Sequence, residues 1–185
     1  TLRIARAMAG LRQPTLVMPG NNDTGDIHQL AAELAHQNGL NQLMSISRNA
    51  DKPVNPIVLC GYSRHLIKAG QLEVALMAGR PHSMGGPDLS FPDYMSETSG
   101  RASLEDSGKR LMALIDETDT EHLIFLAHNG PRGLGEEAHA IWGCDFKEGG
   151  GDWGDPDLTA AIDHARASGT QVLAVIAGHM HLRTK

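Results

Sequence analysis

Three short apolar segments of this chain each run directly into a polar turn that carries histidine or asparagine. Each segment has the length and composition of a buried β-strand. The segments are 15–18 before the turn GNND, 123–127 before HNGP, and 172–177 before GHMH. In open α/β sheets, ligand sites form outside the carboxyl ends of the strands. The three turns, although distant in sequence, are therefore expected to meet at one edge of a sheet.

The stretches between these segments alternate between helical and strand patterns. Helices are predicted over 2–11, over 27–37 with Gly39 as a stop, from the capping pair Ser103 and Asp106 to about 116, and from Asp155 to Ser168. Further strands are predicted at 42–46, 56–60 and 73–77, and 79–100 reads as a long irregular loop. This alternation predicts one domain over 1–185 with an α/β layered fold and a mixed or partly parallel sheet.

Composition argues against several kinds of partner. The chain of 185 residues has a net charge of −6, so it lacks the basic field that draws proteins to nucleic acid or anionic membranes. No apolar run approaches the roughly 20 residues of a membrane helix. Cys60 and Cys144 lie far apart, so neither a disulfide framework nor a thiolate metal site is implied. We expect a cytoplasmic location, or a plastid if the source is a plant.

The side chains of the three turns suit a metal site. Histidine nitrogens with an asparagine oxygen, and without thiolate, favour divalent manganese, iron or zinc. Each turn also has a plainer interpretation, because Asn-Asn-Asp is ordinary turn chemistry and the histidines at 179 and 181 can be surface side chains. The combination of three such turns, each behind an apolar strand, favours the metal site.

GNND, AHNGP and GHMH resemble the later signature motifs of the calcineurin-like metallophosphoesterases, which are GNH(D/E), a strand-end histidine, and GHxH. The segments GRPHSMGG at 79–86 and GGDWGDPDL at 150–158 resemble a cyanobacterial and plant-type subfamily, so the likeness covers nearly the whole chain. The resemblance implies the layered α/β/β/α-type metallophosphoesterase fold with its mixed sheet.

The same resemblance implies a hydrolase with two divalent metal ions, manganese, iron or zinc. Asn21, His128 and His179 would bind one ion, His181 would bind the other, and Asp23 would orient the ligand turn. In the family, a hydroxide that bridges both ions attacks phosphorus, and the ions neutralise charge on the phosphoryl oxygens. The implied reaction is hydrolysis of phosphate mono- or diesters, as in a phosphatase or phosphodiesterase.

Asn22 stands where the family usually has a histidine that protonates the leaving group. An amide donates a hydrogen bond but supplies no proton, so we expect slower catalysis or a preference for good leaving groups. His82 or His139 can take over this role if its loop folds across the site, although each is more often an ordinary loop histidine.

Arg80, Arg132 and His82 are the candidates for binding the substrate phosphate. A guanidinium group offers a planar, bidentate set of donors that matches phosphate oxygens. Solvated surface charge is the plainer interpretation of the two arginines. Trp142 and Trp153 flank a glycine-rich loop, where apolar anchoring is favoured over stacking on a base.

The first two motifs of the family, DxH and GDxxD, have no counterpart ahead of Gly20. Literal matches at 26–28 and 151–155 either open a helix or lie between later motifs, so we treat both as coincidental. We therefore expect a fragment that lacks its amino-terminal part, is incomplete at its carboxyl end, and binds metal poorly by itself.

Two other functions compete with the dimetal phosphoesterase. Asn22 and the missing motifs support a non-catalytic binding or scaffold module that keeps the phosphoesterase fold. A nucleotide-binding α/β domain ranks last, because the chain has no GxGxxG or Walker pattern.

Overall fold

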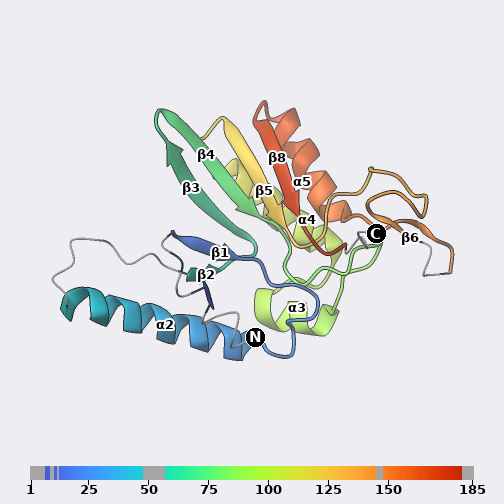
Figure 1. Ribbon diagram of the computed structural model, residues 1–185. Coiled ribbons are helices and arrows are strands. Elements are labelled where there is room, and N and C mark those ends of the chain that lie inside the picture. Colours follow the sequence, from blue (N-terminus) through green and yellow to red (C-terminus); the bar gives the residue numbers. More distant parts are fainter. Residues whose placement is uncertain (1–6, 9–10, 12, 48–56, 145–147, 181–185) are drawn as a thin grey trace.

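The computed structural model describes residues 7–8, 11, 13–47, 57–144 and 148–180, and within these the side chains of 40–47 are left aside. The described residues form a mixed α/β fold with a mixed sheet (Figure 1). Its strands are β1 (Thr15–Val17), β2 (Ile57–Leu59), β3 (Ser63–Ala69), β4 (Leu72–Ala78), β5 (His122–Ala127), β6 (Gly143–Cys144), β7 (Gly151–Asp152) and β8 (Gln171–Ala177). Its helices are α2 (Ile27–Ser47), α3 (Pro92–Ser99), α4 (Leu104–Asp116) and α5 (Pro156–Ala167).

The central sheet has the strand order β3-β4-β5-β8. Strand β3 pairs antiparallel with β4, whereas the β4–β5 and β5–β8 pairs are parallel. The sheet is therefore mixed, as the sequence predicts. Because β4, β5 and β8 run in the same direction, their carboxyl ends lie at one edge. The segments that follow these three strands leave the sheet at that edge.

Helices α4 and α5 cover one face of the central sheet, behind the strands in Figure 1. Leu123 and Phe125 of β5 and Ala75 and Met77 of β4 point into this layer and are fully buried. They meet the apolar faces of the two helices, which include Leu111. Burial of these side chains is the main hydrophobic contribution to the stability of the described fold.

Strand β8 is an edge strand of the described sheet and is largely exposed. Its sequence QVLAVIA is a nearly continuous apolar run, which is typical of strands buried on both faces. Register with β5 places Ile176 beside Leu126, on the face opposite to the helices. Ile176 is 52% exposed and Leu173 is 42% exposed, so much of the apolar surface of this strand faces solvent.

Strands β1 and β2 form a separate parallel pair that packs against helix α2. Leu30 and Leu34 of α2 and Ile57 of β2 are buried together there, with Val17 of β1 packed against them. The backbone N–H of Cys60 donates to Val17 O at 2.9 Å, which continues the pairing past β2. This small layer carries the turn that follows β1.

Several predicted elements are confirmed because their signals are local. Strands at 15–17, 122–127 and 171–177 occur where the apolar runs place them. Helix α4 starts at the expected cap, where Ser103 Oγ accepts the Asp106 N–H at 3.0 Å. Helix α5 begins at Pro156, whose missing N–H costs nothing in the first helical turn.

Other predicted elements are wrong. The segment 42–46 is helical, because α2 continues through Gly39 to Ser47 instead of ending there. Its apolar residues also fit helical spacing, and one internal glycine costs a helix only about 1 kcal/mol. Strand β3 was not predicted, and the supposed loop 79–100 contains helix α3.

The helix predicted over 2–11 falls mostly on positions outside the described residues. Among the described helices, none combines the length and the apolar character needed to cross a membrane.

A matched pair of leucine substitutions tests the packing of the helical layer. Leu111→Ala should lower the free energy of unfolding by roughly 2–5 kcal/mol, because Leu111 is 1% exposed and its truncation leaves a cavity. Leu66→Ala on β3 should change it by less than about 0.5 kcal/mol, because Leu66 is 56% exposed. Urea denaturation followed by circular dichroism measures both, and equal losses would contradict the packing described.

Candidate metal centre

The side chains of Asn21, His128 and His179 converge, although they come from three distant turns. His128 Nε2 lies 3.0 Å from Asn21 Oδ1 and 3.0 Å from His179 Nδ1. The two imidazole rings meet edge to face with their centroids 4.9 Å apart. These residues follow β1, β5 and β8 respectively, so the ends of three strands bring together three of the four predicted metal ligands.

His128 Nε2 has more close polar neighbours than one ring nitrogen can satisfy by hydrogen bonding. The Asn21 N–H points at this nitrogen at 3.4 Å and needs an acceptor, whereas Asn21 Oδ1 needs a donor. A nitrogen of a neutral imidazole is either a donor or an acceptor, and both ring nitrogens of an imidazolium donate. Asn21 Oδ1 and one nitrogen each of His128 and His179 are thus three lone-pair atoms close enough together to be candidate metal ligands.

The spacing of these donor atoms fits a shared ion. Ligand atoms that each lie about 2.1 Å from one metal are about 3 Å apart when they subtend a right angle at it. Two imidazole nitrogens and an amide oxygen are borderline to hard donors, a set that suits Zn²⁺, Mn²⁺ or Fe²⁺. The geometry of the three side chains is therefore compatible with one divalent ion.

Pairing of β5 with β8 fixes the relative position of the two histidines. The strand register ends at Ala127 opposite Ala177, and the Gly178 N–H then donates to His128 O at 3.0 Å. His179 has a φ of 70°, in the left-handed region that non-glycine residues seldom adopt. This backbone conformation turns the imidazole back toward His128, and such strained residues cluster at functional sites.

Asp23 closes the turn that carries Asn21. Its carboxylate Oδ2 accepts the Gly20 N–H at 2.8 Å, and its own N–H donates to Gly20 O at 3.1 Å. These reciprocal bonds set the backbone of the turn and hold Asn21 near His128. Asp23 therefore fixes the turn next to Asn21, and its role in orienting a metal ligand stays a prediction. Asn22, in the same turn, is exposed.

His82 is 3% exposed and binds the backbone of the same turn. Its Nδ1 lies 2.8 Å from Gly20 O, which can only accept, so Nδ1 carries a proton and donates. In the neutral ring Nε2 is then the acceptor, and Tyr94 Oη lies 3.4 Å from it. Burial lowers the pKa of His82, which favours this neutral form. The predicted substrate-binding residue His82 is thus occupied with holding the ligand turn.

Arg80 lies in the protein interior, where it binds two carboxylates. Its Nε donates to Asp157 Oδ2 at 2.9 Å and its Nη2 donates to Asp155 Oδ1 at 2.8 Å. The Arg80 side chain is 1% exposed, and both carboxylates are equally buried. The structure therefore does not bring Arg80, predicted to bind substrate, together with the three converging side chains.

Neighbouring polar side chains extend this Arg80–Asp155–Asp157 network. Ser83 Oγ donates to Asp155 Oδ1 at 2.6 Å, and Asn129 Nδ2 donates to the same oxygen at 3.2 Å. Ser107 Oγ donates to Asp157. Asn129 directly follows His128, so the network also anchors the turn that carries this ligand. Sequence reasoning missed Ser83, Ser107 and Asn129 because isolated serines and asparagines have no distinctive pattern.

The network holds two carboxylates against one guanidinium in a site without water contact. Burial, followed by repulsion from Asp157, raises the pKa of Asp155 to about 6, against the attraction of Arg80. Asp155 therefore titrates well above its ordinary value of 3.8. Asp155 occupies the N-cap position of α5, but its carboxylate makes no capping hydrogen bond to that helix.

Two other predicted site residues lie elsewhere. His181, the predicted ligand of the second ion, is outside the described residues. Arg132 is exposed, and its backbone carbonyl accepts from Thr159 Oγ1 at 2.9 Å. Within the described part of the chain, no group of three or more His, Cys, Asp or Glu side chains is placed to hold a metal. The convergence found here contains two histidines and an asparagine.

No family model, curated protein or solved structure matches this chain. The resemblance to the metallophosphoesterases therefore stays a prediction from the sequence motifs.

Two glycine substitutions in one turn test the packing of His128. A Cβ at Gly20 would lie 2.7 Å from His128 Cε1, whereas a Cβ at Gly25 would have nothing within 4 Å. Gly20→Ala should displace the imidazole and weaken Zn²⁺ binding by about tenfold or more, the effect of disturbing the support of a metal ligand. Gly25→Ala should leave the affinity for Zn²⁺ unchanged. Calorimetric titration with Zn²⁺ measures both, and equal affinities would contradict the proposed packing role of Gly20.

The raised pKa of Asp155 predicts a pH dependence of stability. The folded chain binds the Asp155 proton more tightly than the unfolded chain does, so this contribution is present at pH 4 and is lost as pH rises through about 6. Asp155→Asn removes that slope. The difference in unfolding free energy between the chain and this variant should shift by about 1–3 kcal/mol between pH 4 and 7. Urea titrations at several pH values measure it, and parallel curves would contradict the raised pKa.

Proposed function

We propose that this chain is a metal-dependent phosphoesterase domain that hydrolyses phosphate mono- or diesters. The convergence of Asn21, His128 and His179 carries the proposal. Their order along the chain and their motifs resemble the later motifs of the calcineurin-like metallophosphoesterases, with Asn22 as a departure. Their donor atoms have the spacing and chemistry of a divalent-metal site.

Asn21, His128 and His179 would hold one divalent ion, and His181 remains the predicted ligand of a second. Bound ions of this kind supply an activated water at neutral pH and neutralise charge on the phosphoryl oxygens. Asp23 and His82 would act as positioning residues, because they fix the Gly20 backbone next to Asn21. Arg132 is the predicted phosphate-binding residue with an exposed side chain.

The leaving group must obtain its proton from elsewhere than Asn22. An asparagine amide can donate a hydrogen bond to the leaving oxygen but keeps its protons at neutral pH. His82 is buried and its Nδ1 proton is engaged by Gly20 O. Substrates with good leaving groups, which depart without protonation, should therefore be hydrolysed fastest.

A second candidate function is a non-catalytic module that binds phosphate esters through the same residues. The exposed amide of Asn22 favours this candidate, since it can bind a phosphate ester without protonating its leaving group.

Hydrolysis of p-nitrophenyl phosphate and bis(p-nitrophenyl) phosphate tests the proposal. Both have good leaving groups, so turnover should be detectable with added Mn²⁺ and absent with chelator. His128→Ala and His179→Ala should each lower kcat/KM by about a hundredfold or more, since each removes a metal ligand.

His36→Ala is the matched control, because His36 is an exposed histidine of α2. It should retain full activity. Calorimetric titration with Mn²⁺ separates the two functions. Metal binding that needs His179, without turnover of either ester, would replace the enzyme by the binding module, and absence of both would reject the metal centre.

A further inference from the structure

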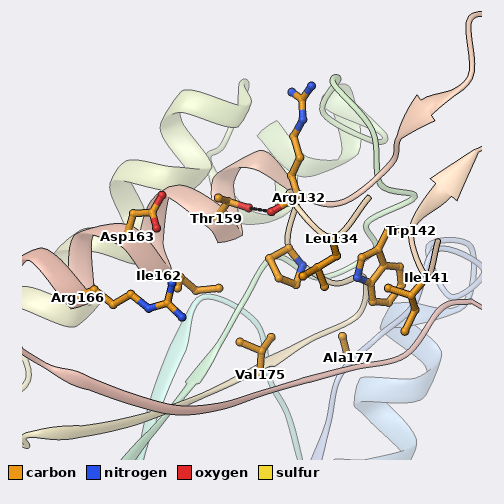
Figure 2. A pocket seen from close by; sticks show the side chains of 12 residues that line it. Arg132, Leu134, Ile141, Trp142, Thr159, Ile162, Asp163, Arg166, Val175 and Ala177 are labelled. Atoms are coloured by element: carbon orange, nitrogen blue, oxygen red, sulfur yellow. Dashed lines mark hydrogen bonds between the residues drawn. The ribbon is translucent and has the colours of Figure 1, made fainter. Parts of the chain in front are cut away.

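A cavity of about 490 Å³ lies between helix α5, strand β8 and the loop that follows His128. Figure 2 shows its lining side chains. Its volume falls within the range of small-molecule sites, which is about 300–1,000 Å³. The three converging ligands do not line this cavity, so it is a second candidate site.

The cavity has a mainly apolar lining. The apolar side chains that line it are Pro131, Leu134, Ile141, Trp142, Ile162, Val175 and Ala177. Leu134 is 55% exposed and Ile141 is 48% exposed. Large apolar side chains that line a concave surface and remain exposed gain from an apolar ligand that covers them.

Hydrogen bonds to the backbone hold the cavity wall in place. Asp152 accepts the Gly133 N–H at 2.6 Å and the Gly154 N–H at 2.8 Å, which ties two loops together. Trp142 packs directly on Gly130, where a Cβ would lie 2.1 Å from the indole ring. The Trp153 N–H donates to Trp142 O at 2.8 Å. A wall fixed in this way loses little entropy when a ligand binds.

Trp142 also carries an unpaired donor beside the cavity. The indole Nε1 is buried and has no hydrogen-bond partner in the described part of the chain. In Figure 2 this nitrogen is turned toward Leu134, a lining residue. Buried indole N–H groups usually have an acceptor.

The charged side chains that line the cavity are Arg132, Asp163 and Arg166. Arg166 extends from α5, and in Figure 2 its guanidinium lies beside Ile162. The Asp163 carboxylate, one turn earlier, points away from Arg166 in the same view. A guanidinium next to an apolar lining favours a ligand with one anionic group.

We propose that this cavity binds a small amphipathic anion. The apolar body of the ligand would lie against Trp142, Leu134 and Ile141, and its anionic group would bind Arg166. This binding requires no metal ion and does not depend on the proposed phosphoesterase activity.

Calorimetric titration of the chain with p-tert-butylbenzenesulfonate, in the presence of chelator, tests the proposal. This probe combines an apolar body with one anionic group and is not a phosphate ester. Saturable binding at one site is expected. The neutral analogue p-tert-butylbenzyl alcohol should bind about tenfold more weakly, because it lacks the charge-assisted bond to Arg166.

Variants with matched controls locate the bound probe. Arg166→Gln and Leu134→Ser should each weaken sulfonate binding by about five- to tenfold. Lys68→Gln and Leu66→Ser remove a cationic and a leucine side chain from β3, where Lys68 and Leu66 are exposed, and should have no effect. Trp153→Phe leaves Trp142 as the remaining tryptophan of the chain, and its fluorescence should change with the same affinity.

His179→Ala distinguishes the cavity from the metal centre. This variant should bind the sulfonate as tightly as the unaltered chain. Loss of binding in His179→Ala would place the anion at the metal centre and overturn the proposal. It would also be overturned by absence of saturable binding, by equal binding of the neutral alcohol, or by equal effects of the β3 and cavity variants.

Discussion

The arrangement of the strand ends depends on the buried ion pairs of Arg80 with Asp155 and Asp157. Arg80 joins the segment after β4 to the start of α5, because Asp155 and Asp157 both bind it. Burying two carboxylates and one guanidinium in the protein interior costs free energy unless each charged group is hydrogen-bonded. Ser83, Ser107 and Asn129 supply those bonds. The network therefore holds three segments in one geometry, and removal of Arg80 would leave two buried negative charges without a cation.

This network and the residues next to it hold the turns of the candidate metal centre in position. Asn129 donates a hydrogen bond to Asp155 and directly follows His128 in the chain. This bond therefore also restricts the backbone position of His128. His82 lies two residues after Arg80 and holds Gly20 through its ring. The positions of the candidate ligands Asn21 and His128 are thus set by bonds that their chain neighbours make. Supporting contacts of this kind govern metal affinity nearly as strongly as the ligands do.

Sequence patterns predicted those parts of the fold whose signals are local. Apolar runs located β5 and β8, and a Ser–Asp cap located the start of α4. The meeting of Asn21, His128 and His179 could be predicted from turns at strand ends. The partners of Arg80 could not, because an arginine in a glycine-rich segment reads equally as a surface cation until its burial is known. The helical state of 42–46 was also missed, since short apolar runs fit both periods.

The exposed apolar strand β8 has a consequence for how the chain behaves at high concentration. Its sequence QVLAVIA contains no charge and no proline, the features by which natural edge strands prevent pairing with other chains. In the described sheet it pairs with β5 alone, so its other edge presents free backbone donors and acceptors. Such a strand is a template for intermolecular β-sheet growth. We therefore expect the chain to associate through this strand at high concentration.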